Sequence, residues 1–219
     1  MNYSFLLLVL SLSFSVVLAQ QHSMCYNYFH KKDGCVYGSA DCPCPEDNSH
    51  KKACSTGSVF KHPETSPSEN HGYSSVHAPK KMRRYDTTSN VFYVDGGQGT
   101  CGFYNTTSQL GVCIWDGPKD VSDPTKAGWL NGGLSQNCNK QVYIQRENQP
   151  ETVQYVPILD SCSFNSTAPE FSCFQTYVTK ALFDLFKPTA YELETGSLYN
   201  LTWDFNNPIN SGKLDNAPI

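Results

Sequence analysis

Ten cysteines are the sequence feature that most constrains the fold of this 219-residue chain. They occupy positions 25, 35, 42, 44, 54, 101, 113, 138, 162 and 173. All of them follow residues 1–19, whose apolar runs at 5–10 and 14–18 end at the small residue Ala19, as in a secretory signal peptide. An even number of cysteines after such a leader predicts a disulfide framework. We therefore expect a secreted, extracellular chain that begins near Gln20.

Other chemistry has little support in the sequence. Zinc is the rival interpretation of Cys42-Pro43-Cys44, but no second close pair of Cys or His at zinc-finger spacing accompanies it. There is no glycine-rich phosphate loop and no Gly-x-Ser-x-Gly nucleophile motif. The net charge is only −4, and no second apolar run is long enough to span a bilayer. We expect a monomer without a metal, a cofactor, a nucleic-acid partner or a membrane partner.

The chain divides into segments of different composition. Residues 20–60 hold five of the ten cysteines and almost no periodic apolar pattern, which predicts a small Cys-rich module ordered by cross-links. Residues 61–89 are polar and rich in turn residues, as an exposed linker would be. We place one domain at residues 90–207 and a C-terminal tail at 208–219.

The linker contains a basic cluster at 80–84 that ends in Arg83-Arg84. In one interpretation the cluster is a solvated basic patch. In the other it is a dibasic processing site, because such pairs in accessible linkers of secreted proteins are cut by furin- or kexin-type proteases. The sequence leaves both open.

The pattern becomes β-like from about residue 90. Runs rich in β-branched and aromatic residues predict strands at 91–94, 111–115, 141–145, 152–159 and 198–205. Pro157 has no backbone N–H for a ladder, so it predicts a sheet edge or a bulge. Thr179 is a candidate N-cap for one helix, which Pro188 ends.

An ordered series of short motifs resembles a known superfamily. The motifs are Phe92-Tyr93, Gly99-Thr-Cys-Gly102, Gly128-Trp-Leu-Asn-Gly-Gly133, Ile158-Leu-Asp-Ser-Cys162 and Leu201-Thr-Trp-Asp-Phe205. Over residues 90–207 they resemble the double-psi β-barrel of RlpA-like, expansin-like, barwin-like and kiwellin-like secreted proteins. The resemblance implies a mainly β fold, a six-stranded double-psi β-barrel with one or two short helices, preceded by a small disulfide-rich module.

The resemblance also implies disulfide pairings. The Cys of the "CG" motif pairs with the Cys that opens the next long strand in such proteins, which gives Cys101–Cys138. The pair after the central Asp carries over to Cys162–Cys173. Cys113 then has no partner in the barrel, and the simplest solution is a disulfide from Cys113 to the 25–54 module.

Asp160 is the candidate catalytic residue. In the hydrolytic and transglycosylating members that the chain resembles, the aligned Asp is the general acid on a glycosidic bond. In the alternative interpretation Asp160 accepts backbone hydrogen bonds and fixes its loop, as in members that only bind. Glycoside hydrolysis usually needs a second carboxylate, but the Asp that opens the helix in expansin-like proteins is missing here, because Tyr177-Val-Thr179 stands at that point. Asp95 is the nearby candidate, although an Asp before Gly-Gly is more commonly a turn residue.

Aromatic side chains are expected to line a groove around these carboxylates. The candidates are Tyr93, Tyr104, Trp115 and Trp129, together with Asp95 and Asp160, because aromatic faces beside a carboxylate suit a polysaccharide. Trp115 and Trp203 could equally belong to the barrel core. Three sequons, at Asn105, Asn165 and Asn200, predict N-glycosylation.

Three function classes follow. The first is a secreted, non-catalytic double-psi barrel that binds cell-wall polysaccharide or an extracellular protein partner. The second is a wall-loosening or lytic enzyme with Asp160 as general acid. The third is a kiwellin- or barwin-like effector or inhibitor in host–microbe interaction. The missing second carboxylate favours the first class, although fold-level analogy does not fix function.

Overall fold

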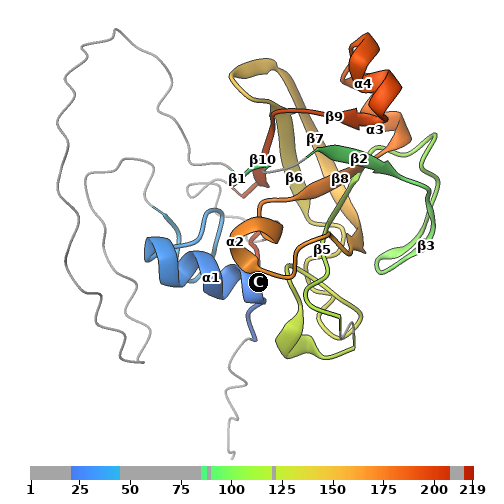
Figure 1. The fold of residues 1–219 in the computed structure, drawn as a ribbon. Helices are drawn as coiled ribbons and strands as arrows, with labels where there is room; N and C mark the ends of the chain where they lie inside the picture. Colours follow the sequence, from blue (N-terminus) through green and yellow to red (C-terminus); the bar gives the residue numbers. More distant parts are fainter. Residues whose placement is uncertain (1–20, 45–84, 88–89, 120–121, 208–214) are drawn as a thin grey trace, which may run out of the picture.

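The computed structural model describes residues 21–44, 85–87, 90–119, 122–207 and 215–219 (Figure 1). The expected signal peptide at 1–19 and the dibasic pair Arg83-Arg84 lie outside these residues. Within them the fold is mainly β, with few helices and a curled sheet, as the sequence pattern predicts. No described helix is long and apolar enough to cross a membrane.

Ten strands and four α-helices make up the described part. The strands are β1 (Tyr85–Asp86), β2 (Val91–Val94), β3 (Gly97–Gly99), β4 (Gly102–Tyr104), β5 (Val112–Trp115), β6 (Gln141–Arg146), β7 (Gln149–Cys162), β8 (Thr176–Thr179), β9 (Ser197–Leu198) and β10 (Leu201–Phe205). The helices are α1 (Met24–Asp33), α2 (Pro169–Ser172), α3 (Lys180–Leu185) and α4 (Ala190–Thr195), with a 3₁₀ turn at Pro124–Lys126.

Eight strands form one mixed sheet in the order β1-β10-β6-β7-β5-β8-β2-β9, and β3 and β4 form a separate hairpin. Most neighbours are antiparallel, but β5 pairs with β7, and β2 with β8, in parallel. The long strand β7 changes partner along its length: it pairs with β6 up to Pro157 and with β5 from Ile158 onward. The register of β5 and β7 then shifts between Val112 and Cys113. Pro157, predicted to mark an edge or a bulge, therefore stands where β7 changes partner, next to a bulge.

The helix predicted after Thr179 is present. The Thr179 side chain accepts a hydrogen bond from the Leu182 amide, and α3 ends before Pro188. The resemblance allowed for a second short helix, and α4 is one, although its position was not predicted. It begins with a capping box between Thr189 and Glu192 and ends at Gly196, whose φ of 65° suits a residue without a side chain.

The N-terminal segment contributes to the main core. Helix α1 buries Cys25, Tyr26 and Phe29 in the same apolar cluster as the strands. The Phe29 ring stacks on Tyr85 at 4.5 Å and lies 5.8 Å from Trp129. Tyr85, which the sequence placed in a polar linker, is only 2 % exposed, because β1 pairs with β10 beside these rings. Cys35, Cys42 and Cys44, with Tyr37 packed against them, form a separate small cluster, whereas Val36 belongs to the main core.

Residues 215–219, at the end of the predicted tail, contact the strands. The Lys140 ammonium donates to the Ala217 carbonyl at 2.5 Å and to Asn137 Oδ1 at 3.0 Å. Burial lowers the pKa of Lys140 to about 8. The Ile219 amide also donates to Asn137, so this short segment is held by side chains of the 137–141 region.

The disulfides correct part of the expected framework. Cys101–Cys138 forms as the resemblance implied. Cys162 does not pair with Cys173. It pairs with Cys113, because the parallel register of β5 and β7 brings their Cα atoms to 5.7 Å.

The expected link between the N-terminal segment and the β domain exists, but it does not involve Cys113. Cys173 pairs with Cys25 of α1, whose backbone amide also donates to the Gly128 carbonyl at 2.9 Å. Cys35–Cys44 closes a local loop. Every described cysteine is in a disulfide, which fits an oxidising compartment.

Removal of the Cys25–Cys173 disulfide should destabilise the protein more than removal of Cys35–Cys44. The sequence separations are 148 and 9 residues, and chain-entropy estimates give about 4–5 and about 2–3 kcal/mol respectively. Denaturant unfolding followed by tryptophan fluorescence would compare the double Cys→Ser variants at each pair. Equal losses would contradict the long-range role of Cys25–Cys173.

Candidate functional site

Asp160 ties the β3–β4 hairpin to β7. Its Oδ1 accepts hydrogen bonds from the Thr100 amide at 2.7 Å and the Ser161 amide at 2.8 Å, and its Oδ2 accepts one from the Tyr104 hydroxyl at 3.0 Å. The hydroxyls of Thr100 and Ser161 lie 2.5 Å apart and add a further contact. Thr100 and Tyr104 both belong to the hairpin, so this one carboxylate fixes the hairpin at two points.

Gly99 shows how closely the hairpin backbone approaches this carboxylate. A Cβ atom at Gly99 would lie 2.6 Å from the Asp160 Cγ and 2.7 Å from each carboxylate oxygen. Any residue with a Cβ atom at position 99 would force the hairpin backbone or the Asp160 carboxylate to shift. The hairpin therefore covers one side of Asp160, and this geometry matches the interpretation in which Asp160 fixes a loop.

Tyr104 is a buried hydrogen-bond donor and not an exposed groove residue. Its side chain is 3 % exposed. Burial, followed by the charge of Asp160, raises the pKa of Tyr104, so the hydroxyl keeps its proton at neutral pH. The expectation that Tyr104 lines an open groove is wrong, because β4 turns this ring inward.

The other predicted groove residues are dispersed. Trp115 and Trp129 are fully buried in the core, so neither can stack on a ligand. The Trp129 indole donates to the Cys173 carbonyl at 2.9 Å, which satisfies its only polar atom. Tyr93 is 40 % exposed and packs edge-on against Phe183 at 5.2 Å. Of the four predicted aromatics, Tyr93 alone presents a substantial surface to solvent.

Asp95 is exposed at the end of β2 and opens a turn. Gly96 and Gly97, which follow it, have φ values of 82° and 111°, so the glycines are required by the backbone. Asp95 contributes to the electrostatic field at Tyr104, whose pKa it helps to raise after the larger effects of burial and Asp160. This placement agrees with the turn interpretation of Asp95.

Sequence reasoning missed Asp116, a second carboxylate next to the Asp160 strand. It follows β5 directly and is only 5 % exposed. The Ser163 hydroxyl donates to its Oδ2 at 2.5 Å, while no described group bonds to its buried Oδ1. Burial, and to a smaller extent the charge of Asp160, raises the pKa of Asp116. The signal was available: Asp116 and Asp160 each stand near the end of an apolar strand, and these strands are parallel neighbours.

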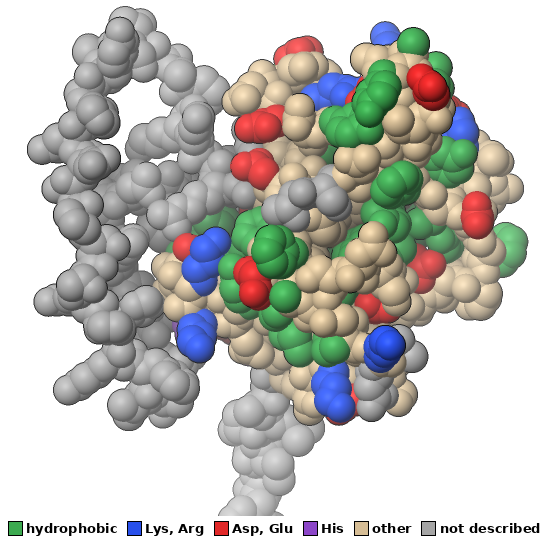
Figure 2. Space-filling model, in the orientation of Figure 1, with side chains coloured by type: hydrophobic (Ala, Val, Ile, Leu, Met, Phe, Trp, Pro, Cys, Tyr) green, Lys and Arg blue, Asp and Glu red, His purple; other side chains and the backbone are tan. Residues whose placement is uncertain are grey.

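An aromatic groove opens elsewhere on the surface, between β2, β8 and the segment around α2. Its cavity of about 490 Å³ has nine lining residues, Asn90, Phe92, Phe164, Asn165, Ser166, Phe171, Ser172, Gln175 and Tyr177. We call this set the aromatic groove. Figure 2 shows this face of the molecule, with hydrophobic side chains gathered over α2 and over α3 and α4. None of the lining residues carries a charge, and neither Asp160 nor Asp95 is among them.

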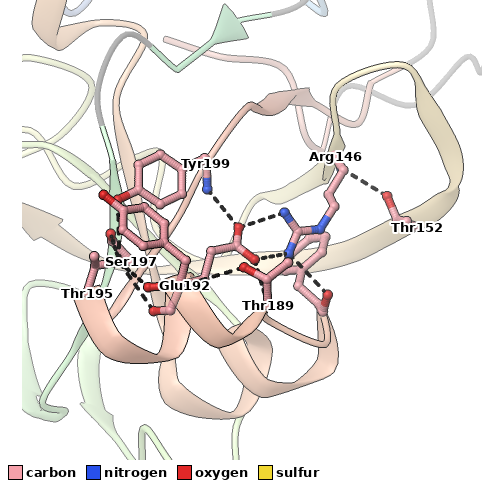
Figure 3. Close-up of polar contacts among 9 residues, drawn as sticks. Arg146, Thr152, Thr189, Glu192, Thr195, Ser197 and Tyr199 are labelled. Carbon is pink, nitrogen blue, oxygen red and sulfur yellow. Dashed lines mark hydrogen bonds and ion pairs between the residues drawn. The ribbon is translucent and has the colours of Figure 1, made fainter.

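A polar cavity of about 320 Å³ surrounds the start of α4 (Figure 3). Arg146 donates to both carboxylate oxygens of Glu192, at 2.8 and 2.9 Å. The amides of Thr189 and Tyr199 donate to the same carboxylate at 2.8 and 3.2 Å. Burial alone would raise the pKa of Glu192, but the hydrogen bonds from Arg146, Thr189 and Tyr199 outweigh it and lower the pKa to about 2. This cluster joins α4 to β6 and is structural.

The three sequons are exposed in different surroundings. Asn105 Oδ1 accepts hydrogen bonds from the amide and hydroxyl of Thr107 at 2.9 and 2.8 Å. Asn165 lines the aromatic groove, and Asn200 lines the polar cavity. Within the described ranges, no group of three or more His, Cys, Asp or Glu side chains is arranged to hold a metal ion.

Comparisons with known proteins add little. No protein-family model matches the chain, and no curated protein sequence does. Among solved structures, the chain is similar to the Streptomyces papain inhibitor, with 20 % sequence identity over 55 % of this chain and 93 % of that protein. The TM-score is 0.37, which is too low for any conclusion about fold or function.

Asp160→Ala should loosen the hairpin and destabilise the fold. Because the substitution removes a charged acceptor from two amides and leaves the buried Tyr104 hydroxyl unpaired, we expect a loss of about 2–3 kcal/mol. Hydrogen exchange should accelerate at the Thr100 amide. Asp95→Ala, at an exposed turn, is the matched control and should leave both quantities unchanged. Unchanged exchange at Thr100 in Asp160→Ala would refute the anchoring role.

Glu192→Gln should remove a pH-dependent part of the stability. The folded pKa of about 2 lies below the ordinary value of 4.5, so the contribution of Glu192 is fully present above pH 4.5 and is lost as the pH falls toward 2. We expect the free energies of unfolding of wild type and variant to differ by about 3 kcal/mol at pH 7 and to converge near pH 2. Denaturant unfolding at a series of pH values measures this. Glu194→Gln, on the exposed side of α4, should show no such difference.

Proposed function

We propose that this chain is a secreted, non-catalytic protein of the double-psi β-barrel type that binds an extracellular protein partner through its β3–β4 hairpin. The main observation behind the proposal is that the Asp160 carboxylate is engaged in hydrogen bonds within the protein. Both oxygens of this carboxylate accept hydrogen bonds from within the protein, and two of the three donors belong to the hairpin. The leader-like residues 1–19 and the disulfides support secretion.

The hairpin has the properties of a preorganised binding element. Phe103, in β4, is 77 % exposed, the largest exposed fraction among the large hydrophobic side chains of the described residues. The turn of the hairpin is fixed by the Cys101–Cys138 disulfide and by the bond from the neighbouring Thr100 amide to Asp160, which also holds Tyr104 in β4. A rigid element loses little conformational entropy on binding, and exposed aromatic side chains are frequent binding hot spots in protein interfaces. This arrangement suits a protein surface with an apolar pocket for Phe103.

An enzymatic role has weaker support. A general acid must deliver a proton to the substrate, yet the Asp160 oxygens are occupied by two amides and a phenol. Asp95 stands in an exposed turn, and Asp116 is buried beside Ser163. A lytic mechanism would require the hairpin to move away from Asp160 before a glycan could reach it.

Polysaccharide binding is the second candidate, and the aromatic groove is the observation that favours it. Its neutral lining of aromatic, amide and hydroxyl side chains has the composition of sugar-binding surfaces. Retention of the intact protein on insoluble chitin or cellulose, and its loss in Phe92→Thr, would support this candidate. The absence of retention on both materials would count against it.

Phe103→Ser should strongly weaken partner binding without changing stability. We expect the wild-type protein, immobilised with its disulfides intact, to retain a partner from the extracellular fluid into which it is secreted. Loss of an aromatic hot spot typically costs about 2 kcal/mol or more, so affinity should fall at least about thirtyfold. Tyr155→Ser, which removes another exposed ring at 56 % exposure, is the control and should bind like wild type. Equal retention by Phe103→Ser would exclude the hairpin as the binding element.

A further inference from the structure

The aromatic groove contains a sequon in its own wall. Asn165, the acceptor of Asn165-Ser166-Thr167, is exposed and lines the cavity next to Phe164. Asn105, by comparison, lines neither of the two cavities described above. A sugar attached to Asn165 Nδ2 would therefore start inside the groove.

The segment that carries Asn165 is held at both ends. Cys162, before it, is bonded to Cys113, and Cys173, after it, is bonded to Cys25. Between them, the Ser172 hydroxyl donates to the Ser166 carbonyl at 2.6 Å, and the Ala168 amide donates to the Ser166 hydroxyl at 3.1 Å. The attachment point is thus fixed relative to the groove walls.

The groove walls match the chemistry of an N-linked glycan. Tyr177 packs edge-on against Phe92 at 5.6 Å and against Phe164 at 4.8 Å, which creates a connected aromatic surface. Phe92 remains 41 % exposed on it. Sugar rings carry apolar C–H faces that pack on such rings, while the half-buried amide of Asn90 offers a polar group for the hydroxyls and the acetamide.

The volume and the charge of the aromatic groove agree with an N-linked glycan as its ligand. The cavity of about 490 Å³ lies within the range of roughly 300–1,000 Å³ that is usual for small-ligand sites. The common core of an N-linked glycan is neutral, and so is every lining residue. Exposed aromatic patches on a soluble protein generally need a cover, and a tethered glycan provides one at high local concentration.

We propose that the aromatic groove is an intramolecular docking site for the N-linked glycan of Asn165. In the glycosylation reaction, Asn165 Nδ2 loses a proton and bonds to the anomeric carbon of a lipid-linked oligosaccharide, whose lipid pyrophosphate leaves. The first sugars then lie against Phe92 and Tyr177. This inference rests on the proposed secretion, because N-glycosylation takes place in the secretory pathway, but not on partner binding by the hairpin. It gives the aromatic groove an occupant from the same chain, in place of the polysaccharide of the second candidate function.

Protection of the glycan from enzymatic release tests the proposal. The full chain is produced with its disulfides in a eukaryotic host, and site occupancy is read from glycopeptide masses. Peptide N-glycosidase then acts on the native and on the reduced, denatured protein. If nine molecules in ten hold the glycan docked, native release at Asn165 is about tenfold slower than denatured release, because the enzyme acts only on the undocked fraction.

Two variants separate docking from general steric hindrance. Phe92→Thr keeps a β-forming residue in β2 but removes the ring, so native release at Asn165 should approach the denatured rate. Tyr155→Thr removes an exposed ring outside the groove and should leave the protection unchanged. An unoccupied Asn165 would overturn the proposal, as would native release that is fast in wild type or equally slow in wild type and Phe92→Thr.

Discussion

The parallel pairing of β5 with β7 is the interaction on which most of the structure depends. It begins where β7 leaves β6 after Pro157, and it aligns Cys113 with Asp160. This register brings Cys113 within bonding distance of Cys162 and places the Asp160 carboxylate where the hairpin can reach it. A parallel pair needs a long crossover connection, so these contacts join segments nearly fifty residues apart. The Cys113–Cys162 disulfide, the anchoring of the hairpin by Asp160 and the burial of Asp116 all follow from this one register.

A second constraint is the aromatic cluster that joins the N-terminal helix to the sheet. Phe29, Tyr85 and Trp129 pack within 4.5 to 5.8 Å of one another, although they come from widely separated parts of the sequence. The Cys25–Cys173 disulfide closes the same contact covalently. Helix α1 is consequently part of the main core, and its stability is coupled to that of the strands. A chain of this size with few charged residues gains much of its rigidity from such rings and cross-links.

Local signals in the sequence predicted local structure well. The strand at 91–94, the N-cap at Thr179 and the unusual position of Pro157 follow from β-propensity, side-chain capping and the missing proline N–H. Non-local pairings were predicted less well. The resemblance paired Cys162 with Cys173 and so left Cys113 without a partner in the barrel, because nothing in the sequence indicated that its strand lies parallel to β7. The sequence also did not show the direction of these side chains. Trp115 and Trp129 could both have faced a groove, but β5 directs Trp115 into the core, and Trp129, in a loop, packs against Phe29 and Tyr85.

Asp160 illustrates how one carboxylate position can serve either chemistry or structure. At the end of an apolar strand, a carboxylate must satisfy its lone pairs with protein donors, water or a substrate. Here the amides of Thr100 and Ser161 donate hydrogen bonds to Oδ1. The role of Asp160 therefore depends on the group that bonds to Oδ2, which is the Tyr104 hydroxyl. The same phenol keeps its proton because of burial and of Asp160 itself, which makes the pair mutually stabilising. The residue at position 104 therefore determines whether Asp160 can accept a substrate, and a tyrosine there favours an anchor for the hairpin.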